Sequence, residues 1–394
     1  MRINRLVKEN DIAQVNALRK VSVGTTRAHE FLVHQAGGHE FVGFTIRDLY
    51  NRVQEENNKL MLDGDAQCSI TWMNMKAIRD HMFYCLSSVD VKGRLANMFW
   101  RDEQSYMDYC SCGDVLIFDS TYKTNMYGKP LVVFVGTNNH RGTVIFGSAL
   151  LVDETEETYN WVLTAFLASM KQKKPVFVLT DSYEAMRKAL GNVMPKARHR
   201  LCVWHVGKKV VSHLKDAGTR GHFFHLIFAG LSIEDWETSW EYFVTMNNSW
   251  ISGMYNKRQR WEKTFFRDDF YAGTSSTQRC EGMHRIMKFG LGSCITMSEM
   301  MPRYEKSVDR IRNRGLYDDY MSDQFSPVLK SHLLVLEEQI GKIYTHDIYL
   351  LIRDQIMFES KFSVARRAVN DRSGGSVVYI FVTWSSRFVV GALD

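Results

Sequence analysis

The sequence has little proline, no long apolar run and an odd number of cysteines. Each of these features argues against a class of protein. Five prolines in 394 residues leave no place for a long proline-rich linker. No stretch approaches 18 consecutive apolar residues, and the N-terminal residues contain no apolar segment typical of a secretion signal. Seven cysteines in so long a chain argue against a secreted disulfide framework and favour a reducing compartment.

The charge balance is only mildly basic. Lys and Arg number 50 and Asp and Glu number 44, which gives a net charge of +6. This excess permits contact with nucleic acid but does not require it. The sequence contains no recognisable lipidation signal and no dense Lys/Arg cluster, so a nuclear address cannot be read from it.

The first quarter of the chain has the spacing of helices. Apolar side chains recur at helical intervals in residues 1–35, 45–58 and 70–98, and Gly37-Gly38 separates the first two stretches. We therefore expect a helical N-terminal segment over residues 1–98.

From Phe99 the pattern changes to strands. Residues 114–119, 131–135 and 143–146 are short apolar runs that predict three antiparallel strands, with a hairpin turn at residues 138–142. A helix over about 155–170, a fourth strand over 175–180 and another helix follow. The first and fourth strands each end in an acid, Asp119 and Asp181, which would meet if the two strands were neighbours. This order predicts an α/β (α+β) fold whose ribonuclease-H-like core begins with residues 99–204.

The rest of the chain divides by composition. Residues 205–270 are helical and rich in aromatic side chains, which predicts a large helical insertion with its own core rather than a nucleic-acid stacking surface. Residues 271–345 are expected to hold the remainder of the core and a charged helical region. Residues 346–394 form a C-terminal tail with strand character.

Three acids are the candidate catalytic residues: Asp119, Asp181 and Glu281. Carboxylates suit Mg²⁺ or Mn²⁺, and two such ions can activate a nucleophile and stabilise the leaving oxygen in phosphodiester chemistry. Acids brought together without a metal would repel each other. The spacing alone also fits helix caps and turn residues, which is the more common role of an Asp after a strand.

Cys202 and His205 have the spacing of a zinc-ligand pair, and Cys110 with Cys112 could complete four ligands. The favoured interpretation is a buried cysteine and a hydrogen-bonded histidine. Two further roles for His205 stay open, namely support of the acids and contact with a DNA phosphate. Arg141, in the predicted hairpin turn, could also meet a phosphate.

Several long motifs in a fixed order resemble the Mutator-like element (MULE) transposase domain as it occurs in the far-red-impaired-response family of plant proteins. In chain order they are residues 97–102, Gly113-Asp114-Val115, Phe118–Asn125, Asn138–His140, Asp153–Trp161, Thr180-Asp181, His199–His205 and Thr277–Glu281. The resemblance extends from about residue 10 to the end of the chain.

This resemblance implies a nuclear, DNA-binding regulator of transcription, active in light-controlled or developmental gene expression and descended from a transposase. It places Asp119 and Asp181 at the first two catalytic acids, with Glu281 as the best candidate for the third. The expected partners are DNA and a second family member, in a homodimer or heterodimer, and no membrane. Full-length members hold zinc in an N-terminal Cys/His module and a C-terminal SWIM finger, and we expect both to lie outside this chain.

Four positions depart from the family pattern. Ser120, Tyr183 and His284 stand where the family usually has Thr, Asp and Asn, and Cys112 replaces an aromatic residue.

Three hypotheses about the function follow from the sequence. The preferred one is a regulator without enzymatic activity. The second is an active Mutator-type transposase that cuts and joins DNA with Mg²⁺, and the third is a truncated copy without function.

Overall fold

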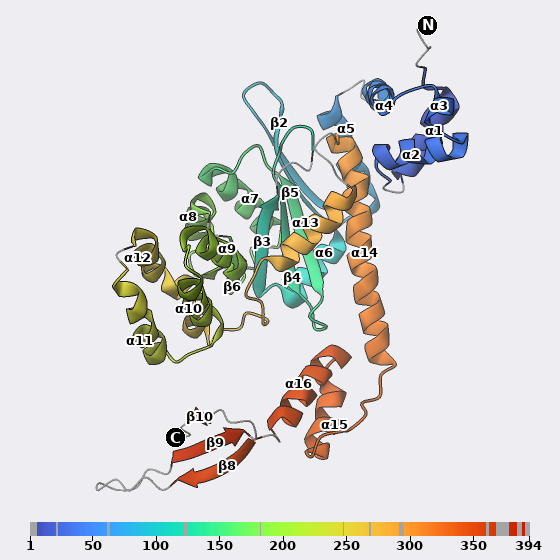
Figure 1. Cartoon of the computed structure of the whole chain (residues 1–394). Coiled ribbons are helices and arrows are strands. Elements are labelled where there is room, and N and C mark those ends of the chain that lie inside the picture. The colour runs from blue at the N-terminus through green and yellow to red at the C-terminus, as the bar shows by residue number, and fades with distance from the viewer. Residues whose placement is uncertain are drawn as a thin grey trace. The chain divides into compact units, whose positions relative to one another are not determined.

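The structure is a computed structural model in which the chain forms two units (Figure 1). The first unit comprises residues 1–136 and 143–311, and the second comprises residues 137–142 and 312–394. The residues that the structure describes are 6–20, 23–60, 64–121, 125–181, 183–246, 248–267, 269–290, 295–359, 362–367, 378–383 and 388–390.

Five helices open the first unit: α1 (Glu9–Lys20), α2 (Thr25–Ala36), α3 (His39–Val42), α4 (Ile46–Leu60) and α5 (Asp65–Arg79). Val15, Ala28 and Leu49 are fully buried in a small core that α1, α2 and α4 share. Asp65, at the start of α5, accepts the backbone N–H groups of Met297 (2.6 Å) and Ser298 (2.8 Å). These bonds cap the first turn of a later helix and so join the N-terminal helices to the core.

A seven-stranded sheet forms the centre of this unit. Its strands are β1 (Tyr84–Val89), β2 (Leu95–Arg101), β3 (Val115–Thr121), β4 (Leu131–Thr137), β5 (Thr143–Leu150), β6 (Phe177–Thr180) and β7 (Arg198–Leu201), in the order β1-β2-β5-β4-β3-β6-β7. β3 pairs antiparallel with β4 and parallel with β6, and β6 pairs parallel with β7. The four predicted strands, β3, β4, β5 and β6, have the expected ribonuclease-H-like arrangement, and β7 adds a strand that the sequence did not predict.

The helix expected over residues 70–98 ends at Arg79, and the remainder of that prediction was wrong. Residues 84–89 and 95–101 are the antiparallel strands β1 and β2, and β2 continues the sheet beside β5. Met98, Phe99 and Trp100 are all buried, because β2 is covered on both faces. A strand of this kind shows no alternation of apolar and polar residues.

Alternate side chains of β3 and β4 enter two different cores. Val115 and Ile117 pack with α5, α13 (Gln278–Gly290) and α14 (Met297–Asp323), whereas Leu116 and Phe118 pack with α6 (Glu103–Cys112), α7 (Glu156–Ser169) and α8 (Glu184–Val193). Figure 1 shows α13 crossing one face of the sheet. Asp119 is an odd-numbered residue of β3, so it lies on the face that α13 covers.

After β7 the chain forms the predicted helical insertion. It consists of α9 (Val203–His213), α10 (Ala217–Phe228), α11 (Ile233–Val244), α12 (Ser249–Asn256) and two 3₁₀ turns, Arg258–Arg260 and Lys263–Phe266. Trp236 and Trp261 are fully buried against Phe223 and Trp240 in a core of the insertion's own. The prediction that these aromatic residues pack with one another is confirmed.

The second unit contains the end of α14, α15 (Leu334–Ile343), α16 (His346–Glu359) and an antiparallel sheet of β8 (Phe362–Arg367), β9 (Val378–Thr383) and β10 (Phe388–Val390). The charged helical region expected before residue 346 is helical from 297 onward, except over residues 324–333 and 344–345. None of the described helices is both long enough and apolar enough to cross a membrane.

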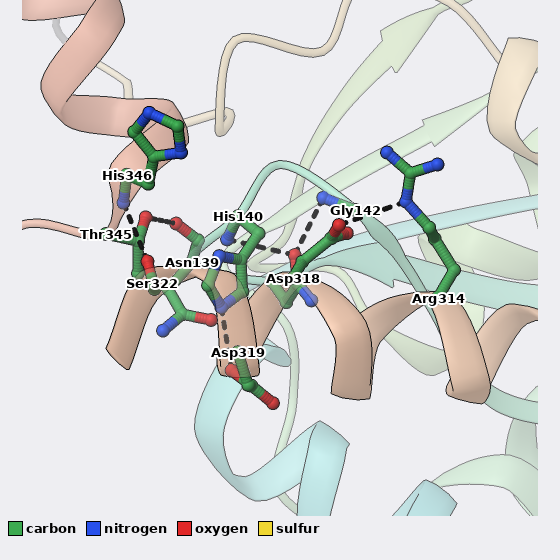
Figure 2. A network of polar contacts seen from close by, with 10 residues as sticks. Asn139, His140, Gly142, Arg314, Asp318, Asp319, Ser322, Thr345 and His346 are labelled. Atoms are coloured by element: carbon green, nitrogen blue, oxygen red, sulfur yellow. Dashed lines mark hydrogen bonds and ion pairs between the residues drawn. The ribbon is translucent and has the colours of Figure 1, made fainter. Parts of the chain in front are cut away.

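The turn between β4 and β5 belongs to the second unit and forms the predicted hairpin. Figure 2 shows its polar contacts with the end of α14 and the start of α16. The buried ring of His140 lies 2.7 Å from the carboxylate of Asp319, and Thr345 Oγ1 donates to the carbonyl of Asn139 (2.6 Å). The contact of Arg141 with a phosphate stays a prediction.

Candidate metal centre

Two of the predicted acids come from neighbouring parallel strands. Asp119 lies in β3 and Asp181 directly follows β6, and the register places Ile117 opposite Leu179. The two acids therefore meet at the carboxyl ends of their strands, as the sequence predicted. Asp119 is almost fully buried, whereas Asp181 is half-buried and accepts the backbone N–H of Tyr183 (2.9 Å).

Two helices bring further ligand groups to the same edge. Glu281 lies in the first turn of α13, which packs over β3, and His205 lies in the first turn of α9, just after β7. One ligand atom each of Asp119, His205 and Glu281 lies within 4.8 Å of the other two. Three segments that are far apart in the sequence thus place two carboxylates and an imidazole around one point.

These residues line a cavity of about 710 Å³. Asp181 lies in its wall with the three residues of the cluster, so all three predicted acids face one space. Its wall also includes Ser120, Glu154, Tyr183, Trp204, Lys208, Gln278 and Arg285. Sequence reasoning had no signal for Lys208 and Arg285, because single cations on helices are usually solvated surface residues.

The cavity destabilises the charged forms of two of its carboxyl groups. Burial, together with the negative charges of Asp181 and Glu281, raises the pKa of Asp119 to about 7. Hydrogen bonds from the Ser120 backbone and the Thr277 hydroxyl offset only part of this shift. Burial also raises the pKa of Glu281, against the lowering effect of Lys208. A divalent cation would remove this cost, because it stabilises the charged form of every acid around it.

Two buried polar atoms of the cluster have no hydrogen-bond partner among the described residues: His205 Nδ1 and Glu281 Oε1. Buried polar atoms in folded proteins are nearly always paired. Their convergence beside Asp119 fits a bound ion, and carboxylate oxygens are the donors that Mg²⁺ and Mn²⁺ prefer. The residues present are thus suited to a divalent cation.

Cys202 and His205 do not act together in this geometry. The Cys202 sulfur accepts the Thr277 N–H (3.1 Å) and lies 3.3 Å from the Thr277 hydroxyl, and burial raises the pKa of its thiol. In the part of the chain that the structure describes, no cluster of three or more metal-ligating side chains includes Cys202. The arrangement matches the favoured interpretation of a buried structural cysteine, and it places His205 with the acids.

Comparison with known proteins finds a match to a family model and relatives in a plant. Residues 115–209 match the MULE transposase domain. Along 93% of its length the chain is 28% identical to Protein FAR1-RELATED SEQUENCE 5 of Arabidopsis thaliana, and along 90% it is 27% identical to Protein FAR-RED IMPAIRED RESPONSE 1 of the same plant. The chain is thus similar to far-red-impaired-response proteins over most of its length, and part of it matches the MULE transposase domain.

Other relatives in Arabidopsis thaliana include Protein FAR1-RELATED SEQUENCE 4, which is 29% identical over 77% of the chain. The chain covers 47%, 44% and 43% of these three relatives, so it spans less than half of their length. The segment of the chain that matches the MULE domain contains Asp119, Asp181 and His205, and Glu281 lies beyond it.

Proposed function

We propose that this chain is the DNA-associated core of a nuclear transcription regulator. In this proposal it is a domesticated transposase that binds DNA without cutting it. It acts in light-controlled or developmental gene expression. The observation that carries the proposal is its similarity to FAR1-type proteins over 93% of the chain. The name of Protein FAR-RED IMPAIRED RESPONSE 1 connects that relative with a response to far-red light. We propose nuclear location and transcriptional control for this chain on the basis of that similarity.

Contact with DNA has a physical basis in the same cavity. Lys208 and Arg285 lie in its wall beside the acids, and the chain as a whole carries a net charge of +6. Lys and Arg side chains bind phosphate and release condensed counterions, so the affinity of such a contact falls steeply with salt. We expect the DNA backbone to pass this edge of the sheet.

Fluorescence anisotropy with a labelled duplex tests the DNA contact. The purified chain should bind duplex DNA at 50 mM salt and lose affinity as salt rises, and replacing Lys208 and Arg285 with Ala should reduce the log–log salt slope by about 2. The variant Lys342→Ala is the control, because this exposed lysine of α15 pairs with Glu338 (2.7 Å) and is not part of the cavity wall. Binding that does not respond to salt, or an unchanged slope in the double variant, would exclude the contact.

The regulatory role needs a second measurement. A fluorescent fusion of the chain should accumulate in plant nuclei, and tethering it to a promoter should change the output of a reporter gene. A fusion that stays outside the nucleus and leaves the reporter unchanged would contradict the role for this chain, whatever its affinity for DNA.

One observation favours a second candidate, an active Mutator-type transposase: Asp119, Asp181 and Glu281 line the same cavity. An ion held there would supply Lewis-acid stabilisation for phosphodiester cleavage. The purified chain would then nick supercoiled DNA in Mg²⁺ or Mn²⁺, and Asp119→Asn would abolish nicking while DNA binding persists. Absence of nicking by a folded, DNA-binding chain would leave the regulator as the proposal.

A further inference from the structure

The donor set at the cavity is unusual for a site that is expected to bind Mg²⁺, because it includes a nitrogen. The group whose ligand atoms lie within 4.8 Å of one another consists of Asp119, Glu281 and His205. Mg²⁺ prefers oxygen ligands and keeps most of its water, whereas imidazole suits first-row transition ions. Mn²⁺ accepts carboxylate oxygens, and as a first-row transition ion it also binds imidazole nitrogen.

The position of His205 is fixed by bonds to the segment that leads into α13. Val203 N donates to the carbonyl of Ser275 (3.0 Å), and Thr277 N donates to the sulfur of Cys202 (3.1 Å). Cys202 N in turn donates to the carbonyl of Thr180, the last residue of β6 (2.7 Å). The start of α9, which carries His205, is therefore tied both to the segment before Glu281 and to the strand before Asp181. A prepared geometry of this kind is what a metal site requires.

One polar atom of the histidine and one of the glutamate lack a partner in the described part of the chain. His205 Nδ1 and Glu281 Oε1 are buried without hydrogen-bond partners there. Lys208 could neutralise Glu281, but no ion pair joins them among the described residues. Its ammonium lies over the ring of Trp204 instead, 3.1 Å from the centroid. A neutral imidazole nitrogen can donate its lone pair to a cation.

We propose that His205 is a direct ligand, with Asp119 and Glu281, of a divalent cation, and that its nitrogen makes the site prefer Mn²⁺ or a similar first-row transition ion to Mg²⁺. This inference goes beyond the proposed function, because binding of the ion requires neither DNA nor transcription. Asp181, at the same cavity but outside the tight group of three, is then free to contact the ion through water.

Electron spin echo spectroscopy of bound Mn²⁺ tests the ligand directly. One equivalent of Mn²⁺ added to the full chain without DNA should show the ¹⁴N modulation of a coordinated imidazole, and labelling the protein with ¹⁵N-histidine should change it. In His205→Gln the modulation should disappear. Competition should show that the wild-type chain binds Mn²⁺ at least tenfold more tightly than Mg²⁺, with this preference reduced about tenfold in the variant.

His213→Gln is the matched control. His213 belongs to the same helix, but its ring stacks on Trp250 with centroids 4.8 Å apart, so this variant should keep the nitrogen signal. Equal urea midpoints for the variants and the wild-type chain would show that the fold is intact.

Three results would overturn the proposal: no Mn²⁺ binding by the folded chain, bound Mn²⁺ without nitrogen coupling, or coupling that survives His205→Gln. The ¹⁵N label identifies a histidine ligand even if the variant does not fold, and His205 is the histidine of the described group of three. All of these results are independent of the DNA and reporter assays, so failure of the metal site and failure of the proposed function remain distinguishable.

Discussion

Asp119 connects the chemistry of the cavity with the stability of the protein. Its pKa in the folded chain is raised from the ordinary 3.8 to about 7, mainly by burial. A carboxyl group with a raised pKa contributes stability that is fully present below pH 3.8 and is lost as the pH rises through about 7. Without metal at pH 8, Asp119→Asn should therefore be more stable than the wild-type chain, by on the order of 2–4 kcal/mol.

Urea denaturation in EDTA at pH 4 and pH 8 measures this effect. The advantage of Asp119→Asn should shrink towards zero at pH 4, where the wild-type carboxyl is protonated in the folded chain. Saturating Mn²⁺ at pH 8 should reverse the order, because the ion stabilises only the wild-type carboxylate. A variant that is less stable than the wild-type chain in EDTA at pH 8 would show that Asp119 is not held under electrostatic cost.

The residues of the site were predictable to different degrees. Asp119 and Asp181 follow from apolar strands that end in acids, which is a local pattern. Glu281 came from the family resemblance, and the structure brings it to the same cavity. The sequence left the role of His205 open, because its position depends on the contact between Cys202 and Thr277, which lie 75 residues apart in the chain. No local periodicity reports a contact of that range.

At the scale of helices, substitution of two tryptophans near the two ends of the insertion should change the free energy of unfolding by very different amounts. Trp261 is fully buried and its indole N–H donates to the carbonyl of Met254 (2.9 Å), whereas Trp204 is 41% exposed at the cavity. Trp261→Ala should lower the free energy of unfolding by about 3–5 kcal/mol, since it leaves a large cavity. Trp204→Ala should change it by less than about 1 kcal/mol. Urea titrations that gave equal losses would contradict this assignment of core and surface.

In the second unit, one buried carboxylate holds the start of α15. Glu337 is fully buried and accepts the backbone N–H groups of Lys330 (2.9 Å) and Ser331 (2.7 Å) and the hydroxyl of Tyr349 (2.8 Å). Burial alone would raise its pKa, but these hydrogen bonds outweigh burial and lower the pKa to about 2. Glu337→Gln should lower the stability of α15 and α16 by about 1–3 kcal/mol at pH 7, because an amide oxygen replaces the charged acceptor.

The sign of the pH dependence follows from the lowered pKa. The contribution of Glu337 is present above pH 4.5 and is lost as the pH falls towards 2, so the difference between wild-type chain and variant should shrink over that range. Hydrogen exchange of residues 328–343 at pH 7, with urea denaturation at lower pH, measures it. Glu338→Gln is the control, because Glu338 lies on the same helix and pairs with exposed Lys342. Equal exchange in the two variants would exclude the proposed role of Glu337.

Most of the core strands and helices could be predicted from the sequence, and the exceptions have physical causes. The strands β3, β4 and β6 are short apolar runs between turn residues. The order of strands and helices then predicts the ribonuclease-H-like core. β2 was mistaken for a helix because it is apolar on both faces. β7 escaped notice because Arg198, His199 and Arg200 make it look exposed. Arg200 is nevertheless buried, with its guanidinium 5.0 Å from the ring centre of Phe266. Only the folded packing makes such a strand recognisable.

At the scale of the whole molecule, the net charge of +6 and the acid cavity act on DNA in opposite directions. The positive excess attracts the backbone, while three carboxylates repel any phosphate that approaches the cavity without a cation. In EDTA and low salt, the variant with Asp119→Asn, Asp181→Asn and Glu281→Gln should therefore bind duplex DNA about tenfold more tightly than the wild-type chain.

Mn²⁺ should remove this difference, since a bound ion neutralises the wild-type carboxylates and adds its own attraction for phosphate. Anisotropy titrations with and without Mn²⁺ measure both effects. A control that neutralises three acids of α11, with Glu234→Gln, Asp235→Asn and Glu241→Gln, has the same net charge and separates local repulsion from total charge. If both triple variants gained equally, DNA would respond only to net charge and would not approach the cavity. A gain confined to the cavity variant, cancelled by Mn²⁺, would place the DNA backbone at the carboxylates, where the ancestral transposase chemistry would act.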